Sequence, residues 1–345
     1  RKMSKSLGNS PDPIELIEKY GADGVRMGML LASPAGNDLP FDESYCEQGR
    51  NFSNKIWNAL RLINSQKVED IPQSNSSKLA IEWFRAKINQ TLSLLEDDFS
   101  KYRLSESLMR VYKFIWDDFC SWYLEIIKPA YQSPMDKATY EQTLDIFETL
   151  MKILHPFMPF VTEEIYHLIR EREEKDFIML AQMPEVQPFD EKLLADFEFV
   201  QEFVACIRAV RNEKNIPQKN TLEAFFAKTA EAEVVEKYSE LITKLCNLQT
   251  LALCDQKVEK SVAKMVRTME VFVPFADNIN KEEEIKKINE EIKYFEGFKA
   301  SVEKKLANEN FVNKAPQKVV DTERKKLSDC EQKLQTLREQ LAGLA

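Results

Sequence analysis

Two lysines near the start of the chain are spaced for chemistry on phosphates. Lys2 and Lys5 lie in the stretch RKMSKSLGN at residues 1–9. Ammonium groups on a loop can neutralise the charge that develops when a nucleotide triphosphate releases pyrophosphate. Serines and the Gly8-Asn9 turn let the backbone approach phosphate oxygens closely. The stretch is therefore either a phosphate-handling loop or a solvated charged tail, and nine residues alone do not decide between them.

A second segment, residues 47–63, divides polar from apolar side chains as a helix would. It reads EQGRNFSNKIWNALRLI, and no acidic residue occurs between Gln48 and Val68. At 100° per residue, one face carries Arg50, Asn54, Trp57, Asn58 and Arg61. A basic face with an aromatic ring can hold phosphates and stack a base. The alternative is that Trp57 packs against a neighbouring helix or domain while the polar groups cap loops.

Two further groups of basic residues are candidates for contact with a polyanion. The segment IRAVRNEKNIP (207–217) contains basic residues that step by three along one helical ridge: Arg208, Arg211 and Lys214. Lysines also gather around a turn near the C-terminus: Lys304, Lys305, Lys314 and Lys318. For each of these the alternative is a charged side chain that only faces solvent.

Composition limits where such contacts lie. The 345 residues hold 48 Lys and Arg against 57 Asp and Glu, a net charge of −9. A protein coated in positive charge is excluded, so any nucleic-acid contact must come from local basic faces. No apolar run approaches the roughly 18–20 residues that cross a bilayer. The six cysteines are scattered and neither histidine lies beside one, which disfavours a zinc site and favours reduced thiols in a cytoplasmic protein.

Helix signals dominate the first two parts of the chain, and we predict a mainly α fold. Residues 1–40 hold the lysine stretch and two short helices, the first capped by Asp12 with Pro13 and stopped by Gly21. Residues 41–188 predict an antiparallel helical bundle. Its periodic stretches are 44–64, 79–98, 104–127, 136–154 and 161–173.

The last two parts differ in pattern. Residues 189–278 predict a small α/β subdomain. Its expected elements are helices at 191–214 and 231–246 and short strands at 222–226, 250–254 and 271–275. Residues 279–345 carry two apolar stripes joined by turn residues at 308–316. We predict an antiparallel coiled-coil hairpin whose arms project roughly 35–40 Å, at 1.5 Å per residue.

These motifs resemble one family. The stretch KMSKSLGNSPDPIELIEKYGADGVRMGMLLAS (2–33) resembles the signature loop and following helices of the class I aminoacyl-tRNA synthetases. Residues 47–63 and HPFMPFVTEE (155–164) resemble parts of the anticodon-binding bundle in the synthetases for aliphatic amino acids. LANENFVNKAPQKVV (306–320) is similar to the hairpin turn of the valine-specific branch, and the resemblance covers essentially all 345 residues. The isoleucine-specific branch is the alternative, because the amino-acid pocket is not in this chain.

The resemblance implies roles for these residues. A parent enzyme would activate valine with ATP and Mg²⁺ and esterify it to the valine tRNA. Lys2 and Lys5 would be its catalytic lysines. Contacts with ATP would involve Lys2, Met3, Ser4, Lys5 and Ser6. Contacts with tRNA would involve Arg50, Asn54, Trp57, Asn58, Arg61, Arg208, Arg211, Lys304, Lys305 and Lys314.

The same resemblance defines what this segment is expected to lack. The chain is expected to begin inside a longer protein, because residue 1 is not Met. The class also needs a His-x-Gly-His motif, which is missing here, because His155 precedes Pro156 and His167 precedes Leu168. We expect His155 to cap or pack rather than act as a base, and we expect no adenylation and no tightly bound cofactor in this segment alone. We also expect a cytoplasmic monomer. The alternatives are a stand-alone tRNA-binding module without catalysis and a coiled-coil interaction protein without an RNA role.

Overall fold

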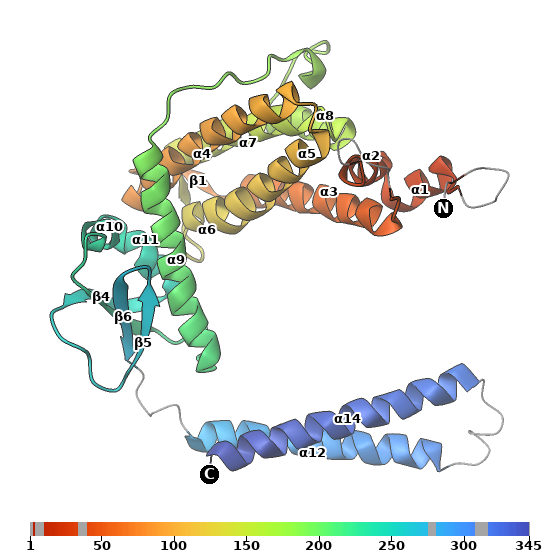
Figure 1. Ribbon diagram of the computed structural model, residues 1–345, viewed down its shortest axis with the longest axis vertical. Helices are drawn as coiled ribbons and strands as arrows, with labels where there is room; N and C mark the ends of the chain where they lie inside the picture. The colour runs from red at the N-terminus through yellow and green to blue at the C-terminus, as the bar shows by residue number, and fades with distance from the viewer. Residues whose placement is uncertain (1–2, 4–9, 34–39, 275–280, 308–316, 345) are drawn as a thin grey trace.

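The computed structural model describes residues 3, 10–33, 40–274, 281–307 and 317–344 (Figure 1). Helices make up most of this part of the chain, and the predicted mainly α class is confirmed. Along the chain come two short helices, a series of longer helices, a segment of mixed helices and strands, and a pair of long helices.

The first two helices are α1 (Pro13–Tyr20) and α2 (Ala22–Leu31). Asp12 caps α1, since its Oδ1 accepts a hydrogen bond of 2.8 Å from the backbone N–H of Ile14. Gly21 separates the helices with φ 77°, in the left-handed region that favours glycine. The predicted start and stop of the first helix are therefore confirmed.

The bundle follows the five predicted periodic stretches. Its helices are α3 (Glu43–Asn64), α4 (Asn75–Ser100), α5 (Leu104–Lys113), α6 (Leu124–Ile127), α7 (Lys137–Leu154) and α8 (Pro159–Ile169), and a short turn η3 (Ile178–Leu180) follows. Two short strands, β1 (Val68–Glu69) and β2 (Met135–Asp136), pair in parallel between them. Helix α8 ends at Ile169, four residues before the predicted end at residue 173. The chain turns back there, and Arg172 Nε donates a hydrogen bond of 2.9 Å to the carbonyl of Tyr166.

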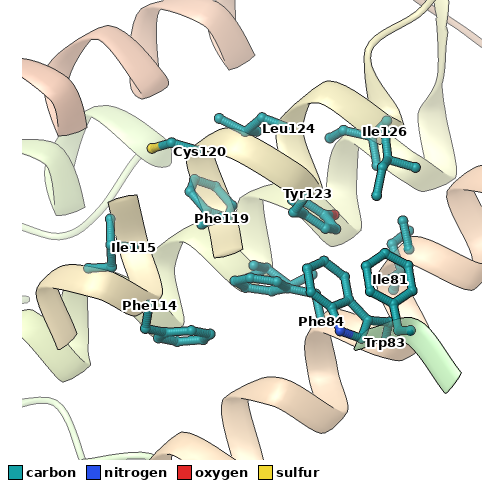
Figure 2. Packing of buried hydrophobic residues seen from close by; sticks show 14 of the residues in the cluster. Ile81, Trp83, Phe84, Phe114, Ile115, Phe119, Cys120, Tyr123, Leu124 and Ile126 are labelled. Carbon is teal, nitrogen blue, oxygen red and sulfur yellow. The ribbon is translucent and has the colours of Figure 1, made fainter. Parts of the chain in front are cut away.

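A π-helical segment, η2 (Phe114–Tyr123), lies where the sequence predicted a continuous α-helix. The wider π turn presents aromatic rings to the core, where Phe84 stacks on Phe114 with centroids 5.1 Å apart (Figure 2). Phe119 stacks on Phe147 at 5.5 Å. The apolar pattern of the sequence did not predict a π-helix, because the same apolar residues are compatible with an α-helix.

The α/β subdomain packs a long helix against a mixed sheet. Its elements are α9 (Glu191–Glu213), β3 (Leu222–Ala227), α10 (Ala232–Lys237), α11 (Ser239–Cys246), β4 (Leu248–Cys254), β5 (Ser261–Val266) and β6 (Met269–Pro274). The sheet order is β4-β3-β6-β5, with β3 parallel to β4 and antiparallel to β6. The sequence missed β5, and the helix predicted at 231–246 is interrupted at Tyr238.

The two long C-terminal helices, α12 (Lys281–Leu306) and α14 (Gln317–Leu344), lie side by side (Figure 1). Ion pairs between them join Glu296 to Arg338, Lys299 to Glu331 and Lys305 to Glu323. The numbers rise along one helix as they fall along the other, so the pairing is antiparallel, as predicted. The buried seam includes Val302, Val320, Cys330, Leu334 and Leu337. The predicted turn at 308–316 lies outside the described residues.

Candidate nucleic-acid interface

Helix α3 has the two faces that its sequence predicted. The apolar set is buried: Phe52, Ile56, Ala59, Leu60 and Ile63. Asn54, Asn58 and Arg61 are exposed, and Trp57 is 37% exposed, so its indole is not enclosed in the core of the described structure. An exposed indole beside amide and guanidinium groups is suited to stacking on a base while neighbouring donors reach phosphates.

Arg50 begins the same face but has partners within the protein. Its guanidinium pairs with Glu47 at 3.2 Å and lies 5.7 Å from the ring centre of Tyr20. The Glu47 pair is exposed on both sides and so contributes little to stability. Arg50 therefore ties α3 loosely to α1 and still presents a partly exposed cation at the end of the face.

The ridge predicted at 207–217 does not form as a basic surface. Arg211 is 1% exposed, and its guanidinium donates to the carbonyls of Pro217 at 2.9 Å, Asn220 at 2.8 Å and Cys246 at 2.8 Å. Burial lowers the pKa of Arg211. The prediction that Arg211 contacts tRNA is wrong, because its donors already hold together the loop after α9 and the end of α11.

Arg208 remains partly exposed one helical turn earlier. Its guanidinium donates to the carbonyl of Leu245 at 3.2 Å and lies 5.6 Å from the Trp122 ring. It lines a hollow of about 460 Å³ between the bundle and the α/β subdomain. Lys244 lines the same hollow and donates to the carbonyls of Ile126 and Lys128 at 2.7 and 2.6 Å. The sequence did not predict this role for Lys244, because no neighbouring residue indicates that a lysine caps the end of α6, more than 110 residues away.

The remaining predicted site residues differ in what the structure says of them. Lys304 and Lys305 are exposed near the end of α12, and Lys305 lies 3.8 Å from Glu323. Met3 is 38% exposed. The other predicted site residues at the two ends of the chain lie outside the described residues: Lys2, Ser4, Lys5, Ser6 and Lys314.

Helix α2 connects the segment after the lysine stretch to the bundle. The Asp23 carboxylate accepts hydrogen bonds from the backbone N–H groups of Phe160 at 3.2 Å and Val161 at 2.6 Å. Arg26 donates to the carbonyls of Phe157 and Pro156, both at 3.2 Å. The sequence showed the two motifs separately, and no local signal revealed that they bind each other.

Histidine 155, beside this junction, has a structural role. His155 Nδ1 lies 2.8 Å from Thr162 Oγ1, and burial lowers the pKa of the imidazole despite the carboxylates of Glu163 and Asp23. The ring is therefore neutral near pH 7 and serves the first turn of α8, as the sequence predicted.

Three glycines let α2 and α3 approach closely. A Cβ at Gly28 would lie 2.7 Å from the backbone nitrogen and Sγ of Cys46, and one at Gly49 would lie 2.7 Å from the carbonyl oxygen of Gly24. A Cβ at Gly24 would lie 3.1 Å from the backbone nitrogen of Arg50. At Gly28 and Gly49 any larger residue would push backbone atoms apart, so the close contact of α2 with α3 requires glycine at these two positions.

Neither a metal centre nor a membrane span is found among the described residues. No cluster of three or more His, Cys, Asp or Glu side chains there is arranged to hold a metal ion. Within the same residues, no helix combines the length and apolarity needed to cross a bilayer.

Three family models match this chain. Residues 1–42 match the class I tRNA synthetases (I, L, M and V), residues 82–226 the anticodon-binding domain of tRNA ligase, and residues 280–345 the valyl tRNA synthetase tRNA binding arm. These models therefore assign three separate segments of the chain to tRNA synthetases, the first of them to class I.

Individual relatives narrow this assignment. The chain is 52% identical over 345 residues to valine–tRNA ligase from Parabacteroides distasonis and 53% identical over 344 residues to that from Phocaeicola vulgatus. Each match covers 100% of this chain and 39% of the relative. Over its whole length the chain is thus homologous to valine–tRNA ligases and corresponds to their C-terminal region.

One solved structure is also similar. It is LeuRS from Agrobacterium radiobacter K84 in a ternary complex with tRNA, with 14% identity, a TM-score of 0.39 and coverage of 77% of this chain and 29% of that chain.

Proposed function

We propose that this chain holds tRNA for a valine–tRNA ligase. The observation that carries the proposal is the match of residues 280–345 to the tRNA binding arm of valyl tRNA synthetases, on a chain about half identical to valine–tRNA ligases over its whole length. The bundle, residues 41–188, takes the anticodon region, and the hairpin, residues 279–345, supports the outer corner of the L-shaped RNA.

The proposed contact surface is local and basic. On α3 it comprises Arg50, Asn54, Trp57, Asn58 and Arg61. Elsewhere it comprises Arg208, Lys304, Lys305 and Lys314. A net charge of −9 argues against binding by overall attraction, so these faces must supply the contacts with phosphates. Exposure of Trp57, Asn58 and Arg61 on one side of α3 supports this assignment.

The chemistry belongs to the whole ligase. We propose that the parent activates valine with ATP, with Mg²⁺ as the counterion of the phosphates, and then transfers valine to the valine tRNA. Lys2 and Lys5 at the start of residues 1–40 stabilise the departing pyrophosphate, and the ATP site includes Met3, Ser4 and Ser6. Residues 189–278 form the small subdomain between bundle and hairpin. We propose a cytoplasmic monomer.

A charging assay on the full-length ligase tests the amino-acid assignment. Valine should be esterified to tRNA, and isoleucine should not be charged at a comparable kcat/KM. Preferential charging of isoleucine would replace the valine assignment with the isoleucine branch. Valine-dependent ATP–pyrophosphate exchange by the 345-residue chain alone would contradict the assignment of activation to the parent.

The α3 face is tested by substitution in the 345-residue chain. Arg61→Ala and Trp57→Ala should each weaken tRNA binding by about 5–50-fold, since base stacking contributes about 1–3 kcal/mol and loss of a phosphate contact weakens binding. Lys137→Ala removes an exposed cation from α7 and serves as the matched control. Equal effects of all three substitutions would refute a specific role for the α3 face.

A further inference from the structure

Helix α8 is capped by a residue from another part of the chain. The first N–H groups of a helix have no partner within it, and a side chain at the N-cap usually satisfies one of them. The N-cap of α8 is Met158, which provides no such hydrogen bond. The N–H groups of Phe160 and Val161 instead bind both carboxylate oxygens of Asp23, 137 and 138 residues away in sequence.

Helix α2 binds both the N–H groups at the start of α8 and the carbonyl groups just before it. Asp23 is 6% exposed on the first turn of α2, and Arg26 follows three residues later on the same side. The carboxylate binds the N–H groups at the start of α8, and the guanidinium binds the carbonyls just before it, those of Pro156 and Phe157. We call Asp23 and Arg26 with these four backbone partners the α2–α8 clasp.

The clasp joins two matched family segments. Asp23 and Arg26 lie within residues 1–42, which match the class I synthetase model, and α8 lies within residues 82–226, which match the anticodon-binding domain. Ser105 on α5 adds a further hydrogen bond of 3.1 Å, which it donates to the carbonyl of Leu31 at the end of α2. The glycine contact with α3 leaves little room for α2 to tilt on its own. Helix α2 is therefore held as part of the bundle.

We propose that Asp23 is a positioning residue for the transfer of valine to tRNA. By capping α8 from α2, it fixes the orientation of the tRNA-binding bundle relative to the synthetase segment. The bundle can then deliver the end of a bound tRNA to the reaction centre. The inference rests on the proposed function, because it requires that the bundle holds tRNA. Small displacements of a reacting group cost large factors in rate, so a loosened clasp should slow transfer more than it weakens binding.

The test uses the full-length ligase that contains this chain, with Asp23→Asn and Asp23→Ala. Asparagine keeps one acceptor oxygen and alanine keeps none, so the effects should be graded, with alanine the stronger. We expect the kcat for tRNA charging to fall about tenfold in Asp23→Ala. The tRNA KM and valine-dependent ATP–pyrophosphate exchange, which needs no tRNA, should stay within about twofold of wild type. If the alanine variant fails to fold, the asparagine variant alone should show the same split, with a fall of at least threefold.

Asp136→Asn is the matched control. Asp136 is 7% exposed and caps α7 through a 2.7 Å bond from the N–H of Thr139, but both groups lie within the bundle. Asp136→Asn should lower the stability of the protein, but tRNA charging and ATP–pyrophosphate exchange should change by the same factor. The inference is overturned if Asp23 variants charge tRNA normally, if exchange falls with charging, or if Asp136→Asn gives the same split. If the wild-type ligase charges no tRNA with valine, the proposed function fails and the inference fails with it.

Discussion

Replacing Gly28 with alanine is expected to force α2 away from α3. The added Cβ would lie 2.7 Å from the backbone nitrogen and Sγ of Cys46 and 2.9 Å from its Cα, whereas ordinary contacts begin at 3.4 Å. The helices must separate by roughly 0.7 Å to relieve this overlap, and a backbone atom cannot rotate away as a side chain can. Overpacking typically costs about 1–3 kcal/mol. Because this overlap is with backbone atoms of Cys46, we take the upper value of about 3 kcal/mol, against about 1 kcal/mol gained in helix propensity.

We therefore expect a net loss of about 2 kcal/mol in Gly28→Ala. For a folded unit of about 150–250 residues, a loss of about 2 kcal/mol corresponds to a fall of about 4–8 °C in melting temperature. Gly297→Ala is the control: its Cβ would meet nothing within 4 Å on α12, so it should be neutral or stabilising by up to about 1 kcal/mol. Urea and thermal unfolding followed by circular dichroism measure both variants. Equal stability of Gly28→Ala and wild type would refute the close-packing argument.

The remaining predictions concern buried charge and the hairpin. Arg211→Met should lower unfolding free energy by about 3 kcal/mol in urea, because three carbonyls lose their donor, while tRNA affinity of the folded protein stays unchanged. Burial raises the pKa of Asp118 to about 6, with Lys87 lowering it and Asp117 raising it further. The folded state thus binds this proton more tightly than the unfolded state, and stability should fall as pH rises from about 4 to about 6. Asp118→Asn should remove about 3 kcal/mol of that dependence, and parallel pH–stability curves for the two proteins would contradict the shift. Deletion of residues 281–345 from the full-length ligase should raise the tRNA KM at least tenfold and leave ATP–pyrophosphate exchange within twofold. An unchanged KM would mean that the hairpin has been misassigned.

Local patterns were sufficient for most helices and for one face of the site. Asp12 and Gly21 mark a helix start and stop through hydrogen bonds and backbone angles that depend on near neighbours. The exposed side of α3 follows from helical periodicity, so Trp57 and Arg61 could be placed on it from sequence. The hairpin likewise repeats one apolar stripe over many turns.

Long-range contacts could not be read in this way. Arg211 lies three residues from both Arg208 and Lys214, a spacing that also fits an exposed ridge. The packing of α11 against α9, which the sequence does not reveal, encloses its guanidinium. Asp23 resembles an ordinary residue in a first helical turn, and its partners are far away in sequence. The strand β5 contains Lys264 and Met265 with intermediate or exposed side chains, so it lacks the apolar run that marked β3.

Filter binding of valine tRNA to the 345-residue chain across a salt series tests the central claim most directly. If the α3 face and the hairpin lysines contact phosphates, the chain should bind tRNA at low salt. The logarithm of the binding constant should then fall linearly with the logarithm of salt concentration, by roughly 0.7–0.9 per phosphate contacted. Four to six contacts would give a slope of about −3 to −5. No binding at 50 mM salt, or binding independent of salt, would contradict the account.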